Sequence, residues 1–305
     1  MKSDERKKSR SRNALMAVLF VIFAAVFVFS LVQLVLILRD YNEGVEIYSD
    51  MRESYMGSNS LMPRPKNVEK EAAQQKENQE ETAAAEPTAP AGNPDYSEYE
   101  HEEKLMFLQT SFNYILVPLY VPDFTELIEM NPEVKGWITI EGTHIDYPFV
   151  QGEDNEKYVR ITLTGKKNNA GTIFIDYHIS YPFEDRNTII HGHNQRNGHM
   201  FHDLVNYKDP EYLKEHPYVK IFLPDGRMLL YRIYSAYEMT DTRTYQYGFS
   251  TDESYAQYLD FTVQSSLYPT GIVPQTWDRV LTLSTCTNTY NDSRFVIHAY
   301  LVEAQ

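Results

Sequence analysis

The sequence predicts a mainly β domain, a barrel or a sandwich, carried on one membrane-spanning helix. Three observations support this. About eight short strands separated by turn residues follow residue 136. An apolar stretch occupies residues 14–38, and a low-complexity stretch at 63–94 separates it from the strands. We therefore expect four parts in order: a cytoplasmic tail at residues 1–13, an anchor at 14–38, a stalk or linker at 39–101, and a folded domain at 102–305.

The apolar stretch is long enough to cross a bilayer. Its only polar side chains are Ser30 and Gln33. As a helix it would extend about 37 Å, against a hydrocarbon core of roughly 30 Å. A cleaved signal peptide is the alternative, but its apolar region would be about 7–15 residues long and would end at a small-residue cleavage site. Arg39 and Asp40 follow instead, so we expect an uncleaved anchor.

The distribution of charge predicts which side of the membrane the domain occupies. Residues 1–13 carry a net +4, and only Arg39 is basic directly behind the stretch. The positive-inside rule therefore keeps the N-terminus in the cytoplasm and sends the domain outside. The whole chain carries −15, which leaves −20 on residues 40–305. A surface this acidic would repel phosphates, so nucleic acid is not expected as a partner.

The stretch between the anchor and the strands has three parts. Residues 41–55 either extend the membrane helix or form a short stalk. Residues 63–94 have almost no large apolar side chains. They cannot bury enough surface to offset their ordering entropy, which predicts a spacer. Residues 102–119 show mixed helical periodicity, with Leu105 and Leu108 on one stripe, and predict a helix before the strands.

Helices and strands can be placed along the domain. Asp123 is the expected N-cap of a helix at 124–130. A short helix is expected at 210–215. Another starts at Thr251 and runs to about Ser266, between the sixth and seventh strands. The strands are expected at residues 136–140, 143–151, 171–175, 187–193, 219–223, 227–237, 279–285 and 295–302.

The chain has one cysteine, Cys286, so a disulfide-stapled domain is not expected. Residues 280–286 alternate like a strand and put Cys286 at its C-terminal end, where the thiol can be reached. A polar loop follows, and Arg294 opens the next strand. If the two strands pair antiparallel, Cys286 and Arg294 lie opposite each other. Topology alone then predicts a thiol beside a guanidinium.

A thiol with a pKa of about 8.5 needs a base or a positive field before it reacts at neutral pH. His191 and His193 are two residues apart, so on a strand they point to the same side. A cysteine paired with a histidine is activated as a nucleophile, and the histidine can later protonate a leaving amine. Arg294 stays protonated, so its donors suit a carbonyl oxygen that gains negative charge.

At these residues the chain resembles the sortases. Residues 282–286, Thr-Leu-Ser-Thr-Cys, are similar to the TLxTC signature of that family. His193, between Gly192 and Asn194, resembles the family's histidine segment, and Arg294 matches its arginine eight residues after the cysteine. The resemblance covers about residues 122–303. The N-terminal helical extension and the helix before the last two strands resemble class B sortases in particular.

The resemblance implies an eight-stranded β-barrel with N-terminal helices and a helix between strands 6 and 7. It also implies a cysteine transpeptidase that needs no metal or organic cofactor. Cys286 would be the nucleophile, His193 the acid and base, and Arg294 the oxyanion stabiliser. We expect substrate contacts from Asn194, Ser284 and Thr285.

The resemblance further implies that the substrates are exported proteins with a C-terminal sorting motif. The cysteine would attack the motif's threonine carbonyl and form a thioacyl-enzyme. An amine, typically of a peptidoglycan precursor, would resolve it on the outer face of a Gram-positive-type membrane. A pilus-assembling enzyme that uses a lysine as acceptor is the alternative. The motif itself is not readable, and we expect its selection to depend on residues 240–275.

The chain departs from the family pattern at two histidines. His191 stands where class B relatives often have tyrosine, which predicts a second titrating group near the thiol. His199 follows Gly198, where a small residue is more usual. Asp292 either orients Arg294 or is a solvated loop carboxylate, and the second interpretation is favoured.

Other functions fit the same residues less well. A metal hydrolase would need ligands beyond His191, His193, His199 and His202, and no acidic residue occurs at a ligand spacing within that run, so no metal site is expected. L,D-transpeptidases have Ser-His-Gly before the nucleophile, and papain-like enzymes place it at the start of a helix. A non-enzymatic anchored binding module would also have an anchor, a spacer and a β domain, but it would tolerate loss of Cys286.

Overall fold

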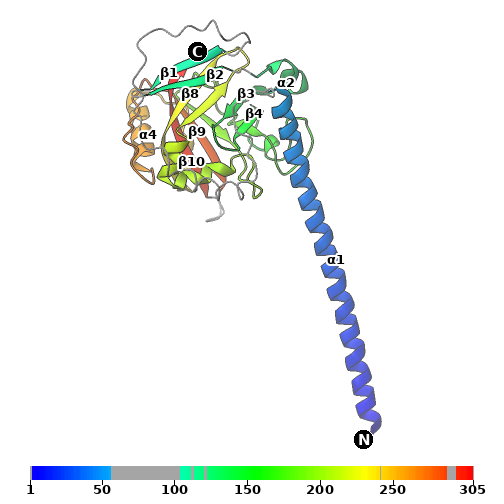
Figure 1. Ribbon diagram of the computed structural model, residues 1–305. Helices are drawn as coiled ribbons and strands as arrows, with labels where there is room; N and C mark the ends of the chain where they lie inside the picture. Colours follow the sequence, from blue (N-terminus) through cyan, green and yellow to red (C-terminus); the bar gives the residue numbers. More distant parts are fainter. Residues whose placement is uncertain are drawn as a thin grey trace, which may run out of the picture.

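The computed structural model describes residues 2–55, 104–110, 113–119, 122–240, 242–286 and 293–304. The spacer expected at residues 63–94 and the carboxylate of Asp292 lie outside these residues. The described part comprises one long N-terminal helix, a separate two-stranded sheet and a closed barrel with helices around it (Figure 1).

The first element, α1 (Lys2–Tyr55), is one continuous helix that leaves the barrel as a single rod, with the N-terminus far from the folded domain (Figure 1). Its large apolar side chains from Leu19 to Leu38 are exposed. The most apolar window of this helix has a mean hydropathy of 2.9, which is enough to cross a membrane by length and composition. The helix continues through residues 41–55, so of the two alternatives for this stretch the structure has the helical extension and not a separate stalk.

The last turns of α1 pack on the barrel. Tyr48 and Met51 are buried, and the Tyr48 hydroxyl donates to the Gly171 carbonyl at 2.5 Å. The Arg52 guanidinium lies 3.8 Å from the Asp146 carboxylate. The sequence assigns residues 39–55 to the linker, but these contacts place residues 40–55 in the folded unit. The reason is tertiary, because the partners of Tyr48 and Arg52 lie about a hundred residues away along the chain.

The helix expected over residues 102–119 does not form. This stretch is instead a hairpin of β1 (Lys104–Thr110) and β2 (Asn113–Leu119), paired antiparallel from Lys104 with Leu119 to Thr110 with Asn113. The β-branched Ile115 and Val117 favour a strand. Pro118 would also break a helix interior, because it has no N–H to donate.

Eight strands close into a barrel in the order β10-β8-β7-β3-β4-β5-β6-β9, and β9 pairs with β10 to complete it. The predicted eight-stranded barrel is therefore confirmed. The strands are β3 (Val134–Thr139), β4 (Asp146–Val150), β5 (Ile173–Ile175), β6 (Asn187–His191), β7 (Tyr218–Phe222), β8 (Met228–Met239), β9 (Val280–Cys286) and β10 (Arg294–Ala304).

The sequence pattern suggests an antiparallel barrel, but two of the strand pairs are parallel. β4 pairs with β5, and β6 pairs with β9, in parallel registers. Parallel neighbours need a long crossover, and residues 192–279 provide one between β6 and β9. These pairings are invisible in strand periodicity, because alternation of apolar residues does not record the direction of a neighbour.

The three α-helices that follow the hairpin lie where the sequence predicts them. The α-helices are α2 (Phe124–Met130), α3 (Pro210–Glu215) and α4 (Asp252–Gln264), and 3₁₀ turns form η1 (Lys157–Val159), η2 (His202–Lys208) and η3 (Thr242–Tyr245). Asp123 caps α2 by accepting from the Thr125 amide at 2.9 Å. Thr251 caps α4, which lies between the sixth and seventh barrel strands as expected.

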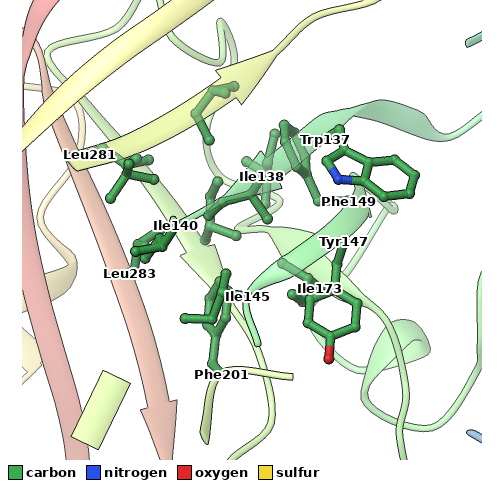
Figure 2. Close-up of a cluster of buried hydrophobic side chains, with 14 of the residues drawn as sticks. Trp137, Ile138, Ile140, Ile145, Tyr147, Phe149, Ile173, Phe201, Leu281 and Leu283 are labelled. Carbon is green, nitrogen blue, oxygen red and sulfur yellow. The ribbon is translucent and has the colours of Figure 1, made fainter. Parts of the chain in front are cut away.

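The core fills the barrel with apolar side chains from β3, β4, β5 and β9 (Figure 2). Trp137 is fully buried, and its indole Nε1 donates to Asp146 Oδ1 at 2.8 Å. Gly136 is required beside it, because a Cβ there would lie 2.5 Å from the Phe222 carbonyl oxygen. The packed core holds β3 and β4 against β9, the strand that ends at Cys286.

A histidine is buried between the last strands. His298 of β10 is inaccessible to solvent, and its ring nitrogens lie 2.8 Å from the Tyr237 hydroxyl and 2.9 Å from Thr282 Oγ1. Burial disfavours the charged imidazolium and lowers the pKa of His298 to about 3. It therefore joins β8, β9 and β10 as a neutral group.

This burial predicts a loss of stability in acid. The folded pKa of about 3 lies below the unfolded value, so the unfolded state binds more protons between the two. The contribution of His298 to the free energy of unfolding is complete above pH 6.5. It falls as the pH drops and is lower by about 3 kcal/mol at pH 4.5. Urea unfolding of the full chain in detergent, followed by circular dichroism at pH 7.5, 6.5 and 4.5, measures it. The pH dependence should flatten in His298→Gln; an equally steep slope in that variant would contradict the assignment.

Candidate active site

The site is organised around β9, which ends at Cys286. β9 pairs with β10 in an antiparallel register that sets Cys286 opposite Arg294, as the sequence predicts. On its other side β9 pairs in parallel with β6, where His191 lies opposite Ser284. The parallel register carries the chain after β6 toward the end of β9, so residues about ninety positions apart meet at one rim.

Two hydrogen bonds extend this pairing past the end of β6. The Gly192 amide donates to the Ser284 carbonyl at 3.1 Å, and Thr285 Oγ1 donates to the Gly192 carbonyl at 2.8 Å. Gly192 has to be glycine, because a Cβ would lie 2.6 Å from the ring of Phe201. The residue directly before His193 is thus fixed against the nucleophile strand.

The residue after the histidine is fixed as well. Asn194 Nδ2 donates to the Cys286 carbonyl at 2.9 Å, and its Oδ1 accepts from His202 Nδ1 at 2.7 Å. The Asn194 amide is therefore committed to contacts inside the protein. The sequence predicts a substrate contact for Asn194, but this geometry favours a role in holding the backbone of Cys286.

The imidazole of His193 is held by a backbone carbonyl. His193 Nε2 donates to the Val159 carbonyl at 2.7 Å, which places the neutral tautomer's proton on Nε2 and leaves Nδ1 able to accept one. Burial lowers the pKa of His193 below its usual range, and the charges of Arg160 and Arg294 lower it further. The hydrogen bond to Val159 opposes this shift without cancelling it. His193 is therefore neutral at physiological pH, the state that a general base requires.

His193, Cys286 and Arg294 line one cavity of about 340 Å³. Cys286 is exposed, and Arg294 and His193 are partly buried. A thiol, an imidazole and a guanidinium from three separate segments therefore face the same space. The arrangement can bind a peptide carbonyl and attack it.

The cavity also contains the second histidine that the sequence singles out. His191 Nε2 lies 3.1 Å from Asp176 Oδ2, and its ring packs between Phe174 and Tyr245. Burial alone would raise the pKa of Asp176. The hydrogen bonds from His191 and His178 outweigh that effect and hold the pKa well below its usual range. Asp176 is thus an ionised carboxylate that lines the cavity. The sequence does not predict it as the partner of His191.

The other two predicted substrate contacts, Ser284 and Thr285, line the cavity but are almost inaccessible to solvent. Ser284 Oγ lies 2.6 Å from the Tyr245 hydroxyl. Sequence patterns missed Tyr245, Asp176 and the Val159 carbonyl. Asp176 follows a predicted strand and could have been noticed, whereas a backbone carbonyl leaves no trace in a sequence.

The four histidines of residues 191–202 do not converge on one point. They contact Asp176, the Val159 carbonyl, the Tyr147 hydroxyl and Asn194. Within the described residues, no group of three histidine, cysteine or acidic side chains has the arrangement of a metal site. Each histidine of this run therefore has a separate structural context.

Comparison with known proteins identifies relatives of this architecture. The sortase domain family model matches residues 138–302. Sortase B of Listeria monocytogenes is 36% identical over 185 residues, which cover 59% of this chain and 74% of that protein.

Solved structures agree with the sequence comparison. The Staphylococcus aureus sortase B–substrate complex is 28% identical with a TM-score of 0.55, over 59% of this chain and 84% of the other. A sortase B complexed with triglycine is 29% identical with the same TM-score, over 59% and 85% of the two chains.

The electrostatics of the site predict the titration of His193. Its pKa should lie below 6.5 in the native chain and should rise in Arg294→Gln, because one of the charges that disfavour the imidazolium is removed. Histidine ¹³Cε1 chemical shifts recorded against pH in detergent measure this. Arg186→Gln, which removes an arginine that pairs with Asp252 at the start of α4, should leave the titration unchanged. A native His193 that titrates above 6.5 would contradict the burial argument.

Proposed function

From the premise that this chain belongs to the sortase family of cysteine transpeptidases and is of class B, we propose that it attaches exported proteins to an amine of the cell wall. The substrate would be a protein with a C-terminal sorting motif. The acceptor would be the amine of a peptidoglycan precursor. The observation that carries this proposal is that Cys286, His193 and Arg294 line the same cavity.

The first half-reaction transfers an acyl group to the enzyme. Neutral His193 takes the proton of Cys286, and the sulfur attacks the backbone carbonyl of the motif's threonine. Arg294, opposite Cys286 in the β9–β10 register, donates to the carbonyl oxygen as it becomes negative. The C–N bond then breaks, and the imidazolium protonates the departing amine. The product is a thioacyl group on Cys286 and a neutral His193.

The second half-reaction reverses these roles. The acceptor amine attacks the thioester and gives its proton to His193, and Arg294 again stabilises the oxyanion. Collapse forms the new amide and releases the Cys286 sulfur, which regains its proton. The neutral state of His193 supports both steps, because the histidine begins each of them as a base.

Two relatives support the proposed substrates. A sortase B has been solved as a complex with substrate and another with triglycine. We therefore propose a sorting-motif peptide as acyl donor and an N-terminal glycine amine as a model acceptor for this chain. A lysine acceptor would be the outcome if the enzyme assembles pili instead.

The anchor completes the proposal. Residues 14–38 would span the membrane once, with residues 1–13 in the cytoplasm and the catalytic unit outside. The exposed apolar side chains of α1 and the excess of lysine and arginine before the span support this orientation. The catalytic domain at residues 102–305 would then work together with the docked end of α1.

The proposed roles predict the effect of removing each side chain. Cys286→Ala should abolish turnover, because no nucleophile remains. His193→Ala and Arg294→Ala should lower kcat by about 10²–10⁴-fold and about 10²–10³-fold. The assay incubates the full chain with a library of sorting pentapeptides and triglycine, and mass spectrometry detects the acyl adduct on Cys286 and the ligated product.

Arg186→Ala serves as the matched control, because this arginine does not line the cavity. Circular dichroism should show that all four variants are folded. Turnover retained in a folded Cys286→Ala, His193→Ala or Arg294→Ala would count against the proposal.

Thr285 is expected to act as a positioning residue through Gly192. Thr285→Val keeps the shape but loses the 2.8 Å hydrogen bond to the Gly192 carbonyl, which would let His193 drift from Cys286. We expect kcat to fall about tenfold or more with little change in KM, and Thr285→Ser to restore it because it keeps the hydroxyl. Full activity in Thr285→Val, or an equal loss in both variants, would contradict a specific role for the hydrogen bond.

A further inference from the structure

One segment of the barrel domain is basic although the exported part of the chain is acidic. Residues 157–175 contain no aspartate or glutamate, and they carry Lys157, Arg160, Lys166 and Lys167. Residues 40–305 as a whole carry −20. A basic segment on such a background calls for a local explanation.

Residues 160–169 of this segment form a hairpin. Ile161 and Lys167 form an antiparallel bridge, and the Thr162 amide donates to the Lys166 carbonyl at 2.9 Å. Gly165 makes the turn at a φ of 80°, in the left-handed region that glycine tolerates. Thr162 and the neighbouring leucine are buried, so the hairpin is anchored at its base. Residues 164–167 at its tip are exposed.

The hairpin runs alongside α1 toward the membrane-spanning part. Going along α1 toward its N-terminus, each contact is made with a residue nearer to the hairpin tip. They join Tyr48 with Gly171, Gly44 with Ala170, and Asp40 with Asn168 and Asn169. These contacts cover about 12 Å of the helix axis at 1.5 Å per residue.

The contact nearest to the N-terminus of α1, that of Asp40 with Asn168 and Asn169, lies at the edge of the predicted membrane. The exposed apolar side chains of α1 end at Leu38, so Asp40 is about 3 Å and Glu43 about 8 Å beyond them along the axis. The headgroup layer is roughly 5–7 Å thick on each side of the hydrocarbon core. A hairpin tip held beside Asp40 and Glu43 is therefore at headgroup depth.

The charges at this depth favour an anionic partner. Lys166 and Lys167 are exposed, as is Arg160, which donates to the Asn169 side chain. Two carboxylates face them from α1. Asp40 accepts from the Asn169 amide at 3.1 Å, and Glu43 lies 3.5 Å from Lys166 Nζ in an exposed pair that contributes little. Arg39 adds a further positive charge at the same level.

We propose that the 160–169 hairpin docks on the anionic lipid headgroups of the membrane in which α1 is anchored. Lipid phosphates would pair with Arg160, Lys166 and Lys167, and α1 and the hairpin together would hold the barrel at two points. This rests on the anchoring proposed above and adds a lipid preference to it. A basic side chain near an anionic surface favours association by about fivefold, so two lysines are worth roughly 25-fold.

The test measures how close the hairpin tip lies to the lipid. The full chain with Cys286→Ser and Thr164→Cys is reconstituted in vesicles of phosphatidylcholine, alone or with 30 mol % phosphatidylglycerol. Bimane added to intact vesicles labels Thr164→Cys only on domains that face outward. Nitroxides on the lipid headgroups quench the bimane fluorescence when the hairpin tip lies close to them. We expect stronger quenching in the anionic vesicles than in phosphatidylcholine alone, and 0.5 M salt should remove the difference.

Variants then assign the effect to the hairpin. Lys166→Gln with Lys167→Gln should shift the docked-to-undocked ratio roughly 25-fold and bring quenching to the zwitterionic level. Lys208→Gln with Lys214→Gln removes the same charge from η2 and α3 and should change nothing. Equal quenching in both vesicle types, or no effect of the hairpin variant, would overturn the proposal.

The same vesicles separate this inference from the proposed reaction. Transpeptidation is assayed with chain that retains Cys286, and vesicle flotation reports whether α1 is inserted. Anionic-dependent quenching without any transpeptidation would refute the reaction and leave the docking intact. Transpeptidation by floating chain whose tip is quenched equally in both vesicles would refute the docking alone.

Discussion

The parallel pairing of β6 with β9 is the constraint on which the site depends. A parallel ladder aligns the C-terminal ends of its two strands, so the residues after β6 arrive where β9 ends. The Gly192 carbonyl then meets Thr285, and Asn194 meets the Cys286 carbonyl, on either side of His193. Backbone geometry therefore holds His193 near the end of β9, without a direct bond between the side chains of His193 and Cys286 being needed to keep it there.

Electrostatics complement this placement. Burial keeps His193 neutral, and Arg294 adds to that effect while remaining available for a developing oxyanion. The carboxylate of Asp176, paired with His191, lines the same cavity. The cavity therefore holds both a guanidinium and a carboxylate.

One segment of the chain links the docked end of α1 to His193. Tyr48 contacts Gly171 and Thr172, and the same segment of chain begins near Val159, whose carbonyl holds His193. The Thr172 amide donates to the Tyr158 carbonyl, which ties the two ends of this segment together. The end of α1 and His193 thus both contact residues 158–172, which include most of the basic hairpin, so the end of α1 is part of the folded unit.

Features that arise from neighbouring residues could be predicted from the sequence. Alternation and turns predicted the strands, an apolar run predicted the membrane helix, and Cys286 and Arg294 could be paired because one short loop joins their strands. Periodicity misjudged residues 102–119, where strand propensity and Pro118 prevailed. Three features became known only from the folded chain: the parallel ladder of β6 and β9, the partner of His191 and the docking of residues 40–55. Those contacts join segments up to about 130 residues apart, and packing and hydrogen bonding between such segments are not encoded in any local pattern.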